Sequence, residues 1–167
     1  MKNSNRKVIN NAKGITLLAL VITMIVLLIL AGITIHIGVN GIEESKEDTM
    51  VSELGIVQNA VLQRKTKADL TNEDYPGETI IKANINLEET IEYMNHNKAS
   101  GEEEINRKDS DDSHYYFLSN ENGGLENLGI TNSDDAYIVN YETGEVINYT
   151  KKLTETGKPL YVYAREQ

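Results

Sequence analysis

The hydrophobic and polar positions divide the chain into one long apolar run and a series of shorter amphipathic segments. Residues 15–35 read ITLLALVITMIVLLILAGITI, with no charged residue and only three threonines as polar members. A helix of this length extends about 30 Å, which matches the hydrocarbon thickness of a bilayer. Because a soluble helix of the same length normally keeps a polar face, the run predicts a helix inserted in a membrane.

A second helical segment is expected after a joint that contains two glycines. Gly38, Asn40 and Gly41 form this joint, where each glycine lowers helix propensity by ~1 kcal/mol, and helical spacing resumes from Ile42 to about Arg64. Apolar residues of this segment recur at helical intervals, so they share one face that packs on a small sheet. They are Met50, Leu54, Val57 and Val61. A membrane helix, a linker and a separate soluble helix are the alternative arrangement.

The remainder of the chain predicts a small α+β body. Asn86 precedes an apolar helical pattern and is followed three residues later by Glu89, as at a capped helix start. Residues 101–113 are highly charged and predict a solvated loop. Four later runs rich in Tyr, Val and Ile predict an antiparallel meander. The predicted strands are Tyr115–Leu118, Tyr137–Tyr141, Glu145–Tyr149 and Leu160–Tyr163.

Glycines predict two of the turns in this body. Glu142, Thr143 and Gly144 form a three-residue hairpin in which the glycine is available for the left-handed position. Leu125–Leu128 predicts a single helical turn that Gly129 ends, with the following isoleucine folding back onto it.

Charge is distributed unevenly between the start of the chain and its body. The net charge is −10, yet the first fourteen residues hold four basic residues and no acid, so the body alone carries −14. Such a body repels nucleic-acid phosphates, and no direct nucleic-acid binding is expected. Basic residues before the apolar run and acids after it predict a cytoplasmic N-terminus and an exported C-terminus. The absence of Cys excludes disulfides and Cys-based zinc sites.

The junction at Gly14 is the most informative motif. A leader containing Lys2, Arg6, Lys7 and Lys13 ends at this glycine, and the apolar run begins at the next residue. A secretory signal peptide has a shorter apolar core that ends in a small-residue cleavage site, and none is seen here. The junction resembles the prepilin signal of type IV pilins and of the pseudopilins of type II secretion and competence systems. The resemblance implies cleavage after Gly14, with Ile15 as the new N-terminus.

The resemblance implies a structural subunit of an extracellular filament, and the lack of a catalytic arrangement of residues predicts no enzymatic activity. LENLGI and YIVNYETGEV also look like C-terminal segments of Gram-positive pilin-like proteins. The implied fold is α+β, with a long N-terminal hydrophobic helix packed on a small antiparallel sheet and a short extra helix. The implied partners are the membrane, other copies of the chain, a prepilin peptidase, an assembly ATPase with its platform protein, and minor pilins. The subunit is expected in the cytoplasmic membrane before assembly and in a cell-surface filament afterwards.

One position departs from the family pattern. The family usually carries a glutamate at the fifth mature residue, where this chain has Ala19. That carboxylate is held to pair with the N-terminal amine of a neighbouring subunit, and an unpaired buried amine costs several kcal/mol. Three interpretations remain open. The amine stays near water, as at a filament tip, or backbone carbonyls or Thr16 solvate it, or assembly relies on packing alone.

Two further functions remain as alternatives. One is a pseudopilin of a secretion or DNA-uptake system, and the other is a single-pass membrane anchor with an exported domain. The expected organisation comprises a basic leader at 1–14, a membrane or filament-core half-helix at 15–39, an amphipathic continuation at 40–65, a variable αβ loop region at 66–113, and a sheet region at 114–167.

Candidate chemistry is sparse. His36, His96 and His114 show no metal-ligand or catalytic spacing, and no phosphate-binding glycine motif is present. Acidic clusters at residues 109–112 and at residues 134–135 offer oxygen ligands for calcium, but neither matches an EF-hand loop. A solvated acidic turn is the preferred interpretation of both clusters. The sequence therefore predicts no catalytic residue, no cofactor and no metal ligand.

Overall fold

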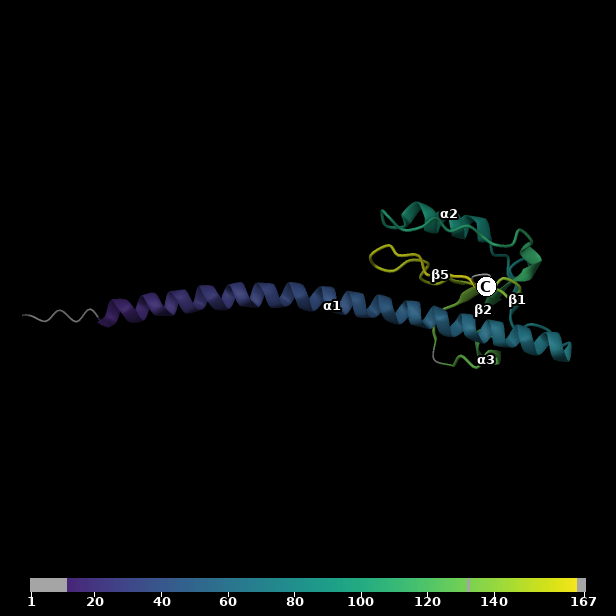
Figure 1. Ribbon diagram of the computed structural model, residues 1–167, viewed down its shortest axis with the longest axis horizontal. Helices are drawn as coiled ribbons and strands as arrows, with labels where there is room; N and C mark the ends of the chain where they lie inside the picture. The colour runs from purple at the N-terminus through teal and green to yellow at the C-terminus, as the bar shows by residue number, and fades with distance from the viewer. Residues whose placement is uncertain (1–11, 132, 165–167) are drawn as a thin grey trace, which may run out of the picture. The chain divides into compact units, whose positions relative to one another are not determined.

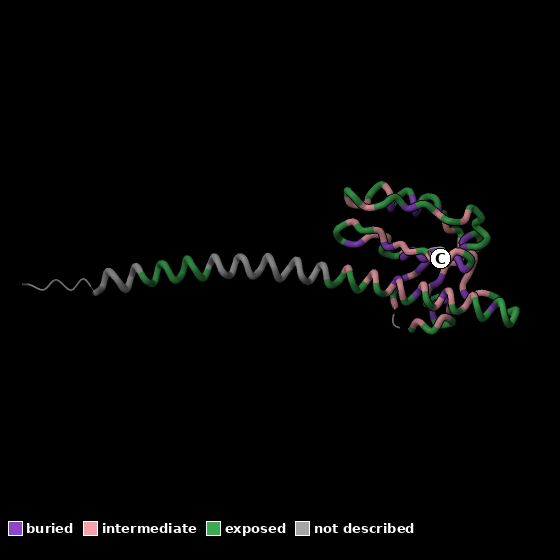
Figure 2. Tube along the Cα trace, viewed as in Figure 1, coloured by how far each residue is buried: buried purple, intermediate pink, exposed green. Residues whose placement is uncertain are grey.

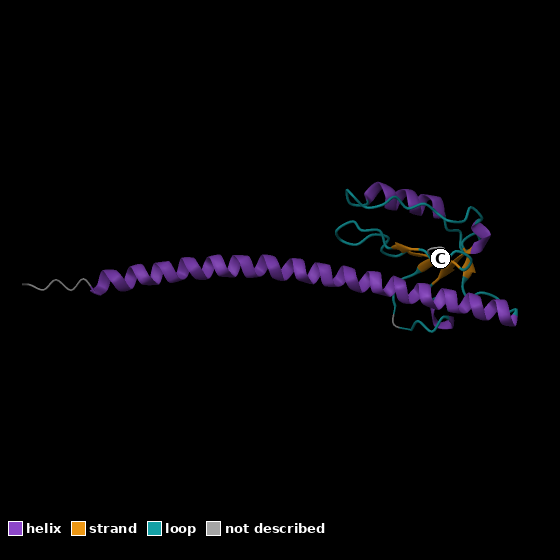
Figure 3. Cartoon of the chain, viewed as in Figure 1, coloured by secondary structure: helices purple, strands orange, loops and turns teal. Residues whose placement is uncertain are grey.

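A computed structural model describes the backbone of residues 12–131 and 133–164, and the side chains of residues 19–27, 45–131 and 133–164. The chain divides into two compact units, Met1–Glu44 and Ser45–Gln167. Figure 3 shows the helices, strands and loops. The elements are α1 (Ala12–Thr71), β1 (Glu78–Thr79), α2 (Leu87–Asn97), the 3-10 turn η1 (Asp112–His114), β2 (Tyr115–Leu118), α3 (Gly124–Asn127), β3 (Tyr137–Asn140), β4 (Glu145–Asn148) and β5 (Tyr161–Val162).

The second unit is built on one antiparallel sheet with the strand order β1-β2-β3-β4-β5. The longest pairings join β2 to β3, where Tyr116 faces Val139, and β3 to β4, where Val139 faces Val146. The α+β class and the antiparallel meander expected from the sequence are therefore confirmed. All four predicted strands form, although β3 and β4 each end one residue earlier than expected and β5 is shorter at both ends.

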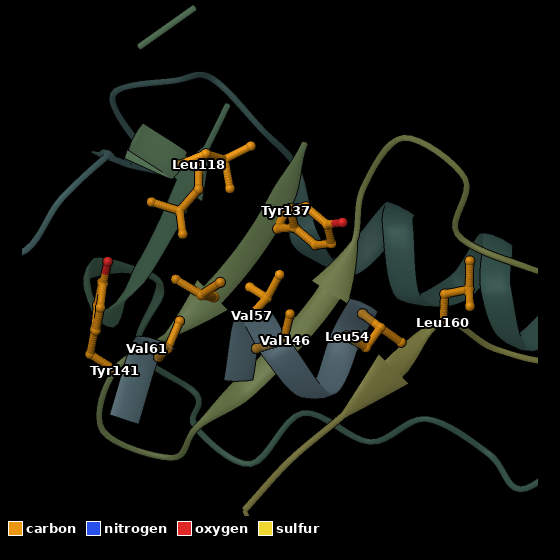
Figure 4. Close-up of a cluster of buried hydrophobic side chains, with 10 residues drawn as sticks. Leu54, Val57, Val61, Leu118, Tyr137, Tyr141, Val146 and Leu160 are labelled. Carbon is orange, nitrogen blue, oxygen red and sulfur yellow. The ribbon is translucent and has the colours of Figure 1, made fainter. Parts of the chain in front are cut away.

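The sheet is covered on both faces. On one face, the second-unit part of α1 packs against side chains of β2, β3 and β4, as Figure 4 shows for Val57, Leu118 and Val146. On the other face, α2 contributes Leu87, Ile91 and Met94 to a separate cluster. Figure 1 shows α1 and α2 on opposite sides of the sheet. Because both faces are covered, every residue of β3 and β4 is buried.

The predicted apolar face of the amphipathic helix is confirmed. Leu54, Val57 and Val61 are at most 2% exposed, and Met50 packs at the edge of the same cluster. Polar contacts align the helix with the β3–β4 hairpin, because Gln58 Nε2 donates to the Gly144 carbonyl at 2.8 Å and Lys65 Nζ lies 2.8 Å from Glu142. The hairpin is thereby held to α1 by apolar and polar contacts together.

The end of α1 differs from the sequence expectation. The helix does not end near Arg64 but continues to Thr71, so residues 66–71 belong to it rather than to the loop region. Asn72 ends it in the left-handed conformation, with φ of +56°, and its N–H donates to the Ala68 carbonyl at 2.7 Å. Asparagine takes this capping conformation in place of the usual glycine. Arg64 then pairs with Glu73 at 2.7 Å and holds the chain reversal.

The predicted helix cap and both predicted turns are confirmed. The Asn86 side chain accepts a hydrogen bond from the Glu89 N–H at 3.2 Å. Gly144 has a φ of +65° in the hairpin. Gly129 has a φ of +78° after α3, and the Ile130 N–H reaches back to the Leu125 carbonyl at 2.9 Å. These local signals therefore determined the local structure.

Two features of the second unit were not predicted. Strand β1 lies in a segment that shows little periodicity, and it pairs with β2 through only two residues. The predicted solvated loop at residues 101–113 is mostly exposed, but Ile105 is buried at 4% exposure beside α2. An isolated isoleucine among charged residues gives no periodic signal, so its burial follows from tertiary packing.

Candidate functional site

The stretch Leu20–Leu27 of α1 presents an apolar surface on all sides. Seven large hydrophobic side chains between residues 20 and 27 are 43% to 65% exposed. Successive helical residues are separated by about 100°, so these positions surround the helix rather than forming one face. Figure 2 shows this stretch as exposed. The residues are Leu20, Val21, Ile22, Met24, Ile25, Val26 and Leu27. A helix that is apolar all round requires apolar surroundings.

The single polar residue within this stretch is compatible with such surroundings. The Thr23 hydroxyl donates to the Leu20 carbonyl at 2.8 Å. This local bond leaves no hydroxyl proton that needs water, and the helical backbone satisfies its own amides. Transfer of this stretch to apolar surroundings would therefore leave neither the Thr23 hydroxyl nor the helical amides without a hydrogen-bond acceptor.

The predicted site residues lie at the beginning of α1. Gly14 and Ile15 fall in its first turn, where only the backbone is described. Ala19 is described, and it is exposed. The helical position therefore leaves room for a larger side chain at Ala19, while cleavage after Gly14 remains a prediction.

Among the described residues, no helix is both long enough and apolar enough to cross a membrane. Most of the predicted membrane segment at residues 15–35 lies outside the residues whose side chains are described.

The second unit contains a buried carboxylate that sequence analysis missed. Glu145 is 1% exposed and accepts four hydrogen bonds. Oε2 accepts from the Tyr115 hydroxyl at 2.6 Å and the Thr143 hydroxyl at 2.8 Å. Oε1 accepts from the Tyr161 hydroxyl at 2.9 Å and the Lys108 N–H at 2.8 Å. The pKa values of the Tyr115 and Tyr161 hydroxyls are both raised. Burial is the larger cause, and the nearby Glu145 carboxylate is the second.

This arrangement joins the sheet to the charged loop. Its donors come from β2, β5, the hairpin and the loop, and all of them point at one side chain of β4. A buried carboxylate is retained at low cost only when donors satisfy its oxygens. A glutamate is almost never fully buried unless it is paired, and no pattern in the sequence indicated the partners of Glu145.

The first acidic cluster is occupied by internal contacts. Asp109 accepts from the Asp111 N–H at 2.9 Å and lies 2.6 Å from His114 Nδ1. Hydrogen bonds lower the pKa of Asp109 to about 2. The bond from the Asp111 N–H has the larger effect, and the bond with His114 has a smaller one. The bond to Asp109 raises the pKa of His114. Asp112 pairs with Arg107 at 2.6 Å. The cluster therefore forms a hydrogen-bonded turn at η1.

The second acidic cluster is also internally paired. Asp135 is 7% exposed, accepts from Asn148 Nδ2 at 2.8 Å and lies 2.6 Å from Lys151 Nζ. Within the described part of the chain, no three acidic, histidine or cysteine side chains are arranged to hold a metal ion. His96 lies exposed on α2, and the side chain of His36 is outside the described residues. Neither acidic cluster gives support to the calcium alternative.

Comparisons with protein-family models, with curated proteins and with solved structures found no match for this chain.

Proposed function

We propose that the chain is a structural subunit of a type IV pilus-like extracellular filament. In this proposal, the leader is removed between Gly14 and Ile15, and the hydrophobic N-terminal helix then packs among copies of itself. The observation that carries the proposal is the exposure of seven large apolar side chains around α1 between residues 20 and 27. The acidic second unit remains in solution and forms the outer surface.

The energetics of the apolar helix support assembly from the membrane. Burial of one large apolar side chain contributes about 1.5–3 kcal/mol relative to water. The stretch from Leu20 to Leu27 contains seven such side chains, so the helix exchanges lipid for other helices but does not enter water. A subunit can thus be held in a membrane first and in a filament core later.

The mass of the mature protein tests this proposal directly. We expect chains purified from the cell envelope to begin at Ile15, which carries or lacks a methyl group, and to sediment as polymers. A Gly14→Val variant is expected to retain Met1, because the added side chain hinders entry of the backbone into the peptidase cleft. Intact-mass spectrometry measures both. Wild-type chains that retain Met1 and never polymerise would contradict the proposal and favour the anchored exported domain.

A pseudopilin or minor tip subunit is the second candidate. Ala19 favours it, because a subunit at a tip need not pair its N-terminal amine with a neighbour's carboxylate. Subunit abundance discriminates between the two candidates. A major pilin makes up most of the purified filament mass, whereas a pseudopilin or tip subunit is present in a few copies.

We expect Ala19→Glu to leave filament yield unchanged or to increase it. Ala19 is exposed on α1, so the new carboxylate fits, and it can pair with the N-terminal amine of a neighbouring subunit. Ala19→Gln is the matched control, since it has the same size without the charge and should give no increase. Sedimented filament per cell measures the effect. Complete loss of filaments in Ala19→Glu alone would contradict this docking geometry.

A further inference from the structure

A cleft of about 460 Å³ lies between α2 and the turn that follows β4. Two tyrosines and polar side chains line this tyrosine cleft, and its volume falls within the range of ligand sites in proteins. The residues used in the argument are Asn84, Glu89, Tyr93, Tyr149, Lys151 and Lys152.

The two aromatic rings are held in position around one ammonium group. Lys152 Nζ lies 4.6 Å from the ring centroid of Tyr149 and 5.9 Å from that of Tyr93, and it donates to the Tyr149 carbonyl at 2.9 Å. Phe117 meets Tyr149 edge-on, with 5.5 Å between the ring centroids. Tyr93 is 53% exposed, so its ring presents a flat apolar surface to solvent.

Donors and acceptors surround this aromatic surface without internal partners. Within the part of the chain that the structure describes, the side-chain amide of Asn84, the carboxylate of Glu89 and the hydroxyl of Tyr93 make no hydrogen bond or ion pair. Lys152 keeps ammonium protons beyond the one given to the Tyr149 carbonyl. Exposed polar groups next to an aromatic ring are suited to a ligand that has both apolar and hydroxyl surfaces.

The backbone around the cleft is held in unusual conformations. Of the three non-glycine residues with positive φ in the described chain, two line the cleft, Asn84 at +55° and Lys152 at +64°. This conformation is tolerated by asparagine but is unfavourable for a residue such as lysine. The turn therefore places the Lys152 ammonium against the rings at the expense of stability, and such strain concentrates at functional sites.

We propose that the tyrosine cleft binds an uncharged oligosaccharide. The C–H groups of a sugar ring carry partial positive charge and pack on the negative face of Tyr93. Its hydroxyls exchange hydrogen bonds with the amide of Asn84, the carboxylate of Glu89 and the ammonium of Lys152. Glu89 and Lys152 balance in charge, and Lys151 is already paired with Asp135 at 2.6 Å, so the cleft favours a neutral ligand over a phosphate.

A peptide strand fits this location less well. Peptides that extend a sheet pair with the backbone of an edge strand. The cleft adjoins the end of β4, which lies between β3 and β5 inside the sheet. No free strand edge is therefore offered there, and recognition must come from side chains. The inference is independent of filament formation, because every residue it uses belongs to the second unit.

Saturation-transfer NMR on the purified full chain tests the inference, in a detergent without a sugar head group. The probes are chitotetraose, maltotetraose and xylotetraose, with tetragalacturonate as the anionic probe and tetraalanine as the peptide probe. We expect transfer to the ring C–H protons of at least one neutral tetrasaccharide. Tyr93→Ala should weaken that affinity about ten-fold through loss of the aromatic contact, whereas Tyr93→Phe should retain it.

Tyr163→Ala is the matched control, because Tyr163 is a partly exposed tyrosine outside the cleft. Its affinity should equal that of the wild type. Circular dichroism verifies that Tyr93→Ala remains folded, which its exposed position predicts. The inference is overturned if no neutral probe binds, if binding is unchanged in Tyr93→Ala, or if tetragalacturonate or tetraalanine binds more tightly than every neutral probe.

Discussion

Replacing Glu145 by alanine is expected to destabilise the second unit by about 3–5 kcal/mol, because one buried and three part-buried donors lose their common acceptor. Small domains are stable by only about 5–15 kcal/mol, so this loss brings the unit near its unfolding limit. Urea unfolding of the full chain in mild detergent, followed by tyrosine circular dichroism, measures the change. The nine tyrosines and the absence of Trp make this the natural probe.

Two variants control for the Glu145 prediction. Glu145→Gln should cost far less, because its amide nitrogen can take the Oε2 position, where Tyr115 and Thr143 are hydroxyls able to accept. Glu142→Ala in the same hairpin removes an exposed ion pair with Lys65 and should cost less than about 1 kcal/mol. A Glu145→Ala variant as stable as Glu142→Ala would show that the buried carboxylate does not hold the loop to the sheet.

Gly77→Ala is expected to lower the stability of the second unit by about 3 kcal/mol or more. Backbone strain and steric overlap of the added methyl group both contribute. Gly77 has a φ of +92° in the turn that leads into β1. A Cβ at this position would lie 2.5 Å from Leu118 Cδ2 and 2.6 Å from the carbonyl oxygen of Phe117. The leucine side chain can rotate, but the carbonyl belongs to β2 and cannot move without disturbing the sheet.

Gly101→Ala is the control that separates steric overlap from backbone strain, because it introduces the strain alone. Gly101 has a similar φ of +102°, and within the described chain no heavy atom lies within 4 Å of the position that its Cβ would take. Its substitution should therefore cost only the conformational penalty, about 1–2 kcal/mol. The same urea titration compares the two variants. Equal losses at Gly77 and Gly101 would mean that β1 and β2 adjust freely to the added methyl group.

The turn at Gly77 matters because it connects α1 to the sheet. The preceding Tyr75 stacks on Tyr141 with 4.3 Å between ring centroids, and the Tyr141 hydroxyl donates to the Pro76 carbonyl at 3.1 Å. Burial raises the pKa of Tyr141, in agreement with its place inside this cluster. Proline and glycine, the residues at 76 and 77, are typical of turns. The close approach of Phe117, which makes glycine necessary there, is visible only in the folded unit.

Local chemistry explains which elements could be predicted. Asn86 with Glu89, Gly129 after α3 and Gly144 in the hairpin each act through the backbone within a few residues, so the sequence alone placed these elements. The face containing Leu54, Val57 and Val61 was predicted for a related reason, since helical periodicity reports burial without identifying the partner.

The unpredicted features depend on segments distant in the chain. Strand β1 is only two residues long and is a strand because β2 pairs with it. Ile105 is buried because α2 covers the second face of the sheet, and Glu145 is buried because loop and strand donors converge on it. The tyrosine cleft likewise needs α2 and the turn after β4 to meet.

The sequence by itself determined the α+β class, the meander, the caps and the apolar face of α1, because each depends on periodicity or on backbone preferences of single residues. It also supplied the basic leader, the Gly14–Ile15 junction and the apolar run on which the proposed filament role rests. Tertiary structure alone decided the covering of both sheet faces, the four donors of Glu145 and the rings around Lys152. These join residues far apart in the chain, where geometry rather than local preference sets the contact.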